Sequence, residues 1–76
     1  MAKIKTFTKG ERDRYSTHDE IEAEYFSFDR DGRRLFQIDI YGREKRQIPG
    51  KTSQTIQLDK DAAQQLISIL KKEFSL

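Results

Sequence analysis

The sequence predicts an α+β fold: an antiparallel sheet of three to four strands, followed by one C-terminal α-helix packed on the sheet. Three observations lead to this prediction. Residues 21–28 and 33–41 alternate apolar and polar side chains on either side of an Asp-Gly pair, which is a strong hairpin signal. Residues 53–58 have the pattern of a further strand. From 59 to 75, apolar residues recur every three or four positions, as on one face of a helix.

The N-terminal part of the chain is expected to be only weakly structured. Lys3 to Thr8 is a short candidate strand, with Ile4 and Phe7 as its large apolar residues. Residues 10–19 are polar and lack periodicity, so we expect a mobile loop there. We expect a single domain over 1–76, in which residues 1–19 form the short strand and the loop.

The central hairpin is the clearest element. If Phe28 lies opposite Arg33, alternation places three pairs on one face. These pairs are Tyr25 with Phe36, Ala23 with Ile38, and Ile21 with Ile40. The other face is mixed and carries Glu22, Glu24, Phe26, Phe28, Leu35, Gln37, Asp39 and Tyr41. An exposed apolar patch of this kind marks an interface.

The last strand leads directly into the helix. The sheet is expected over 20–58 and the helix over 59–75. Asp59 is a suitable N-cap, because its carboxylate accepts hydrogen bonds from the free N–H groups of the first turn. Lys71 and Lys72 suit the negative end of the helix dipole. The apolar stripe, which should pack on the inner sheet face, includes Ala63, Leu66, Ile67, Leu70 and Phe74.

Composition argues against several classes of function. The chain has 76 residues, no cysteine and one histidine, His18, so neither a catalytic triad nor a Cys/His metal cluster is expected. Glu20, Glu22 and Glu24 share one face of a strand, and we interpret them as a solvated acidic stripe rather than a cation site. We therefore expect no catalysis, no metal and no cofactor. No apolar run could span a membrane and no secretory signal is visible, so the expected location is the cytoplasm.

Charge is unevenly distributed, although the net charge is only +2. Residues 15–29 hold five acids and no Lys or Arg, whereas 30–51 hold seven basic and three acidic residues, a balance of +4. The basic candidates are Arg30, Arg33 and Arg34 at the hairpin turn, and Arg43, Lys45, Arg46 and Lys51 in the next connection. Cations neutralise phosphates, and aromatic faces stack on unpaired bases. The combination favours binding of single-stranded nucleic acid.

Residues 35–70 resemble the positive-cofactor-four family of single-stranded DNA-binding transcriptional coactivators. The matching segments are Ile38-Asp39-Ile40, Pro49-Gly50-Lys51, and Thr55 to Asp59 followed by a helix. The resemblance implies a curved antiparallel sheet, a C-terminal helix, a dimer, and basic β-ribbons that grip single strands in transcription or replication. It assigns Arg43, Lys45, Arg46 and Lys51 to the ribbon, and Tyr41 to a position where the family has an aromatic residue.

A homodimer is expected because a lone chain of this size gains little net stability from its own core. The candidate dimer or partner interface comprises Phe26, Phe28, Leu35, Leu66, Leu70 and Phe74. A second function stays open: an accessory subunit that binds a protein partner through its acidic and aromatic sheet face. In that case the exposed aromatic residues contact the partner protein instead of DNA.

Overall fold

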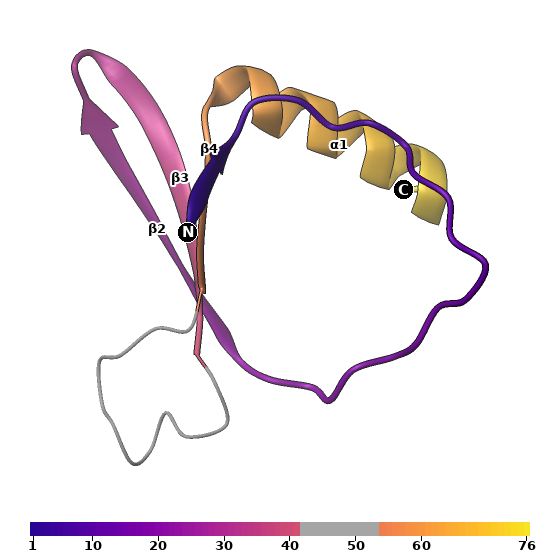
Figure 1. The fold of residues 1–76 in the computed structure, drawn as a ribbon. Helices are drawn as coiled ribbons and strands as arrows, with labels where there is room; N and C mark the ends of the chain where they lie inside the picture. The colour runs from indigo at the N-terminus through magenta and orange to yellow at the C-terminus, as the bar shows by residue number, and fades with distance from the viewer. Residues whose placement is uncertain (42–53) are drawn as a thin grey trace.

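The structure is a computed structural model that describes residues 1–41 and 54–76. Its elements are β1 (Ala2–Ile4), β2 (Ala23–Arg30), β3 (Arg33–Ile40), β4 (Gln54–Leu58) and α1 (Lys60–Phe74). The strands form one sheet in the order β1-β4-β3-β2, and α1 follows β4 directly (Figure 1). The predicted α+β class is confirmed. The sheet is mixed, because β1 pairs parallel to β4 while the other two pairings are antiparallel.

The hairpin register differs by two residues from the predicted one. Arg30, not Phe28, lies opposite Arg33, so Tyr25 pairs with Ile38. The reason is a two-residue turn in which Asp31 and Gly32 have φ values of 54° and 77°. Positive φ at both positions matches the twist of the flanking strands and extends the pairing to the turn.

A shift of two residues leaves the side chains within β2 and β3 on their predicted faces, because strand side chains alternate with a period of two. Tyr25 therefore still stacks on Phe36, now as a diagonal neighbour, with ring centroids 5.5 Å apart and planes at 25°. The apolar face also carries Ile4, Ile38, Ile40, Ile56 and Leu58. The opposite face, here called the mixed face, carries Lys3, Glu24, Phe26, Phe28, Arg30, Arg33, Leu35, Gln37, Asp39, Thr55 and Gln57. Ile21 and Glu22 were expected on the strand but precede β2, and Ile40 pairs with Ala23 instead of Ile21.

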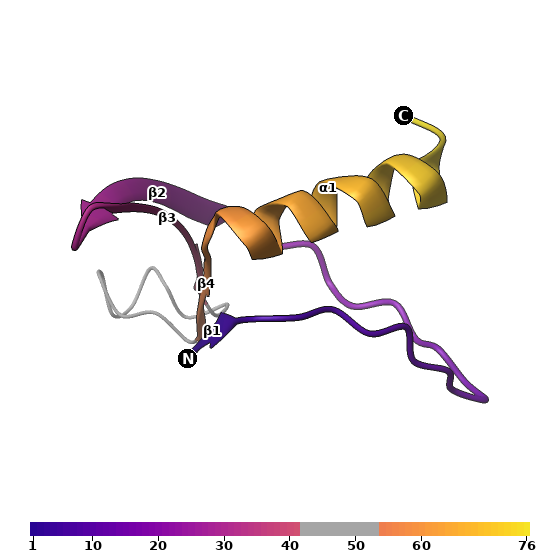
Figure 2. The ribbon, with the colours of Figure 1, turned by 90° about the horizontal axis from the view of Figure 1, so that it is seen from above.

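The helix begins and ends as the sequence predicts. The Asp59 carboxylate accepts a 3.0 Å hydrogen bond from the backbone N–H of Ala62, which confirms the N-cap. Ser75 closes the helix in the left-handed conformation. Packing on the sheet is limited to the first two turns, where Ala62 is fully buried. From Ile67 onward every helical residue is exposed, and α1 extends away from the sheet (Figure 2).

The predicted strand from Lys3 to Thr8 is shorter than expected. Pairing of β1 ends at Ile4, because its partner Leu58 is the last residue of β4. The chain then runs alongside α1 (Figure 1). There its backbone forms hydrogen bonds with the side-chain amide of Gln65 instead of with a neighbouring strand. Gln65 Oε1 accepts from the Phe7 N–H at 3.0 Å, and Gln65 Nε2 donates to the Lys5 carbonyl at 3.2 Å. Residues 8–22 form no regular element before β2.

The core is small. Among the described residues only Asp39, Tyr41, Leu58 and Ala62 are buried. The described part of the chain has no helix with the length and apolar character needed to cross a bilayer.

Candidate nucleic-acid interface

The mixed face is ordered by charge from one end to the other. Arg30 and Arg33 face each other beside the turn. Phe28 and Leu35 form the next pair, and Phe26 opposite Gln37 the one after that. Glu24 opposite Asp39 lies at the far end. The face therefore has a basic end, an aromatic middle and an acidic end.

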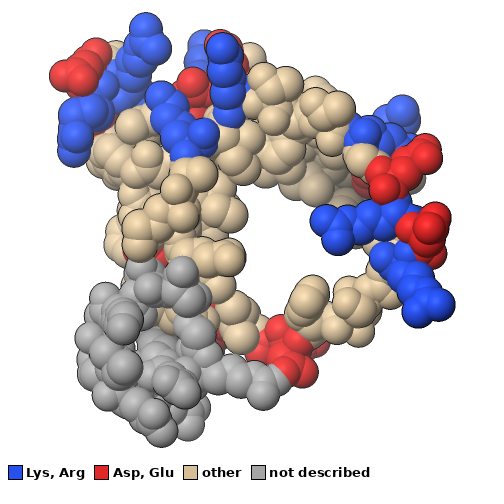
Figure 3. Space-filling model, viewed as in Figure 1, with Lys and Arg blue, Asp and Glu red and all other residues tan. Residues whose placement is uncertain are grey.

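The cations of the hairpin divide between the two faces. The Arg30 guanidinium lies 5.8 Å from the centre of the Phe28 ring, a cation–π distance, and extends the aromatic surface. Arg34 points from the other face and pairs with Asp29 at 3.3 Å. Both side chains of that ion pair are about two-thirds exposed, so the pair contributes little stability. Figure 3 shows basic side chains gathered at the hairpin tip with acidic ones among them.

The aromatic middle of the face is accessible from solvent. Phe26 is 42% exposed, and Phe28 and Leu35 are half-buried. Hydrophobic side chains on a sheet face that none of the described elements covers offer flat surfaces for a ring or base to stack on. These three residues were predicted as an interface, and the fold brings them together on adjacent strands.

Beside the aromatic residues, polar side chains form a hydrogen-bonded ladder that sequence reasoning missed. Gln57 Nε2 donates to Gln37 Oε1 at 2.9 Å, and Gln37 Nε2 donates to Asp39 Oδ1 at 2.9 Å. Thr55 Oγ1 donates to the same Asp39 oxygen at 3.0 Å. Alternation placed Gln37 and Asp39 on this face, but only the register between β3 and β4 brings Gln57 and Thr55 beside them.

Tyr41 lies just beyond β3 and is 8% exposed. A hydrogen bond with Glu24, burial, and the negative charges of Glu24 and Asp39 together raise the pKa of Tyr41 to about 12. Its hydroxyl therefore stays protonated to a higher pH than that of an ordinary tyrosine, and it links the residue after β3 to Glu24 on β2.

The remaining predicted basic residues, Arg43, Lys45, Arg46 and Lys51, lie outside the described residues. Of the predicted helix residues at the interface, Leu66 is half-buried, whereas Leu70 is 37% and Phe74 70% exposed. The two exposed residues leave the far end of α1 without a covering surface from the described residues.

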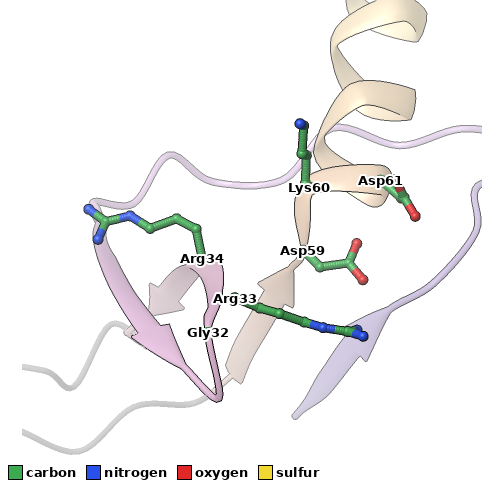
Figure 4. A pocket seen from close by; sticks show the side chains of 6 residues that line it. All are labelled: Gly32, Arg33, Arg34, Asp59, Lys60 and Asp61. Carbon is green, nitrogen blue, oxygen red and sulfur yellow. The ribbon is translucent and has the colours of Figure 1, made fainter.

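A pocket of about 420 Å³ lies between the hairpin turn and the start of α1. Its lining residues are Gly32, Arg33, Arg34, Asp59, Lys60 and Asp61. Figure 4 shows that Arg34 and Lys60 point away from Arg33, so the three cations do not converge on one point. Sequence reasoning missed this juxtaposition, because nothing local links a hairpin turn to a helix N-cap far along the chain.

The described ranges 1–41 and 54–76 contain no group of three or more His, Cys, Asp or Glu residues that could hold a metal ion. Comparison with known proteins gives no match to a family model, a curated protein or a solved structure.

Proposed function

We propose that this protein is a small non-enzymatic module that binds single-stranded DNA on the mixed face and acts as a dimer in the cytoplasm. One observation carries the proposal: Arg30 and Arg33 lie on the same sheet face as Phe26 and Phe28. Guanidinium groups neutralise phosphates, while aromatic rings stack on bases without regard to their sequence. The resemblance to the positive-cofactor-four family points to the same ligand.

The chemistry favours a single strand over a duplex. Stacking on Phe26 or Phe28 needs a base that is not already stacked within a double helix. Duplex recognition by a helix needs a basic helix face, but α1 carries three lysines against Asp61 and Glu73. At the far end of the mixed face, Glu24 and Asp39 repel phosphates. Most phosphate contacts of a bound strand are therefore expected toward the hairpin end.

The amount of exposed surface supports a dimer. The chain exposes 7290 Å², whereas a folded monomer of 9.0 kDa exposes about 4,900 Å². The excess of about 2,400 Å² is comparable to the surface that one subunit of an obligate homodimer buries, about 1,000–2,500 Å². Leu70 and Phe74 are among the exposed apolar residues of α1 that a second subunit would cover, which leaves the mixed face for DNA.

The same excess of exposed surface favours a second candidate, an accessory subunit that binds a protein partner. In that case the partner covers Phe26 and Phe28, and the acidic end of the face pairs with basic residues. Phe26→Asp with Phe28→Asp then abolishes the protein complex, and the purified protein carries no nucleic acid. An ultraviolet absorbance ratio typical of co-purified nucleic acid favours the DNA-binding function instead.

The experiment is a fluorescence anisotropy titration of a labelled single strand of about 20 nucleotides, at about 50 and 200 mM salt. The wild type should bind tightly at low salt and outcompete duplex. Replacing Arg30 and Arg33 by Ala should lower the slope of log affinity against log salt by about 1.4 in magnitude, since each phosphate contact to a single strand contributes about 0.7.

The matched control replaces Lys71 and Lys72 by Ala, which removes the same charge from the far end of α1. This control should keep the wild-type slope. Equal slopes for all three proteins would contradict the assignment of phosphate contacts to the hairpin.

A further inference from the structure

One row of side chains crosses all four strands of the mixed face. Phe26 on β2 is the register partner of Gln37 on β3, and Gln37 is the partner of Gln57 on β4. Gln57 is in turn the partner of Lys3 on β1. Since neighbouring strands lie 4.7–4.9 Å apart, the row is about 14 Å long. It presents an aromatic ring, two amides and a cation in that order.

The hydrogen bonds fix which way the two amides point. An ionised carboxylate has only acceptors, so Asp39 must receive the Nε2 group of Gln37. The Oε1 atom of Gln37 then faces Gln57 and requires a donor, so Gln57 must also present its Nε2 there. A flipped amide at either position would bring two donors or two acceptors together. Asp39, which is 8% exposed and lies two residues from Gln37 on β3, thus sets the orientation of both amides.

This orientation leaves two hydrogen-bonding groups of Gln57 available to a ligand. Its Oε1 atom accepts no hydrogen bond from the described residues, and one of its two amide hydrogens is not donated to any of them. A glutamine amide with one acceptor and one donor pairs in a bidentate manner with the N6 and N7 atoms of adenine. The carboxylates of Glu24 and Asp39, next along the face, disfavour bases whose facing edge carries carbonyl oxygens.

We propose that this row is a base-reading subsite for adenine within the bound single strand. The inference rests on the proposed function and adds a base preference to it. The adenine ring stacks on Phe26, its amino edge meets the amide of Gln57, and Lys3 contacts a phosphate on the outer edge of the sheet. Gln37 is a positioning residue, which holds the Gln57 amide in the orientation that adenine requires.

The test is competition by unlabelled oligo(dA), oligo(dC) and oligo(dT) of about 20 nucleotides against a labelled single strand of mixed sequence. In the wild type, oligo(dA) should displace the label at about tenfold lower concentration than oligo(dT). Oligo(dC), which has an amino group but a smaller ring, should fall between them. Gln57→Leu should bring the dA-to-dT ratio close to one, because it removes the amide that is specific for adenine. Gln64→Leu, the same change on the exposed side of α1, should leave the ratio unchanged.

The outcomes separate the two proposals. Salt-sensitive binding with equal competition by all three oligonucleotides overturns the base-reading subsite and leaves the proposed function standing. A dA preference that persists in Gln57→Leu overturns the role given to Gln57. Absence of binding at low salt overturns the proposed function and, with it, the subsite.

Discussion

The Tyr41 hydroxyl shares a hydrogen bond with Glu24 on β2, at the acidic end of the mixed face. Because its pKa is raised to about 12, the protonated form is favoured in the folded state. The stability that this contact contributes is fully present below the ordinary tyrosine pKa of about 10. It is lost as the pH rises from there through about 12.

Tyr41→Phe tests this contact. The tyrosinate absorbance of wild type and variant should be titrated at alkaline pH. The difference between the two curves should have its midpoint near pH 12, because only the wild type contains the Tyr41 hydroxyl. The variant should be less stable than the wild type at neutral pH, and this gap should narrow between about pH 10 and pH 12. A difference titration centred near pH 10 would show that Glu24 does not hold the hydroxyl.

Phe26 and Tyr25 are neighbours in sequence that the strand places on opposite faces. Phe26→Ala should weaken single-strand binding by about 1–3 kcal/mol if one base stacks on it. Tyr25→Ala removes a similar ring from the apolar face and should change the affinity less than about threefold. Anisotropy titrations of both variants, with circular dichroism to check folding, decide the matter. Equal losses would mean that the face has been assigned wrongly.

At the scale of the element, α1 depends on its cap because little of it is buried. Asp59→Ala removes the acceptor for the Ala62 N–H and should cost about 0.5–2 kcal/mol in urea unfolding. Asp61→Ala removes only a favourable interaction with the helix dipole and should cost less, about 0.3–1 kcal/mol. If Asp61→Ala proved the more damaging change, the cap would not be the feature that starts the helix.

Local sequence predicts most of these elements. The features that it does not predict, the hairpin register and the strand order, depend on pairing between strands. The Asp-Gly turn, the alternation in β2 and β3, and the Asp59 cap are all readable within a few residues. The exact hairpin register depended on whether two or four residues form the turn, which alternation alone does not distinguish. The parallel pairing of β1 with β4 joins segments more than fifty residues apart, so no local pattern indicates it.

The candidate site likewise contains residues that local sequence predicts and residues that it does not. Arg30, Arg33, Phe26 and Phe28 could be predicted because one hairpin carries them all. The amide ladder could not, since it needs β4 in register with β3. The limited packing of α1 was also hidden from the sequence. Apolar periodicity indicates that one face of the helix is buried, but it does not indicate whether the sheet or a second subunit buries it.

For the whole molecule, the excess of exposed surface predicts self-association. Sedimentation equilibrium at tens of micromolar should give a mass near twice 9.0 kDa. Leu70→Asp should shift the protein toward the monomer, because it buries a charge in the interface. Gln64→Asp, on the exposed side of the same helix, should leave the dimer intact. A monomeric wild type well above micromolar concentration would contradict this prediction.

The central claim is that the mixed face binds a single strand, and NMR titration of the ¹⁵N-labelled protein tests it most directly. On addition of an oligonucleotide of about 20 nucleotides, the side-chain amide signals of Gln37 and Gln57 should shift, together with the backbone signals of Phe26, Phe28 and Arg33. The Gln64 side chain and the last turn of α1 should stay in place. Shifts confined to α1, or no shifts at low salt, would contradict the account.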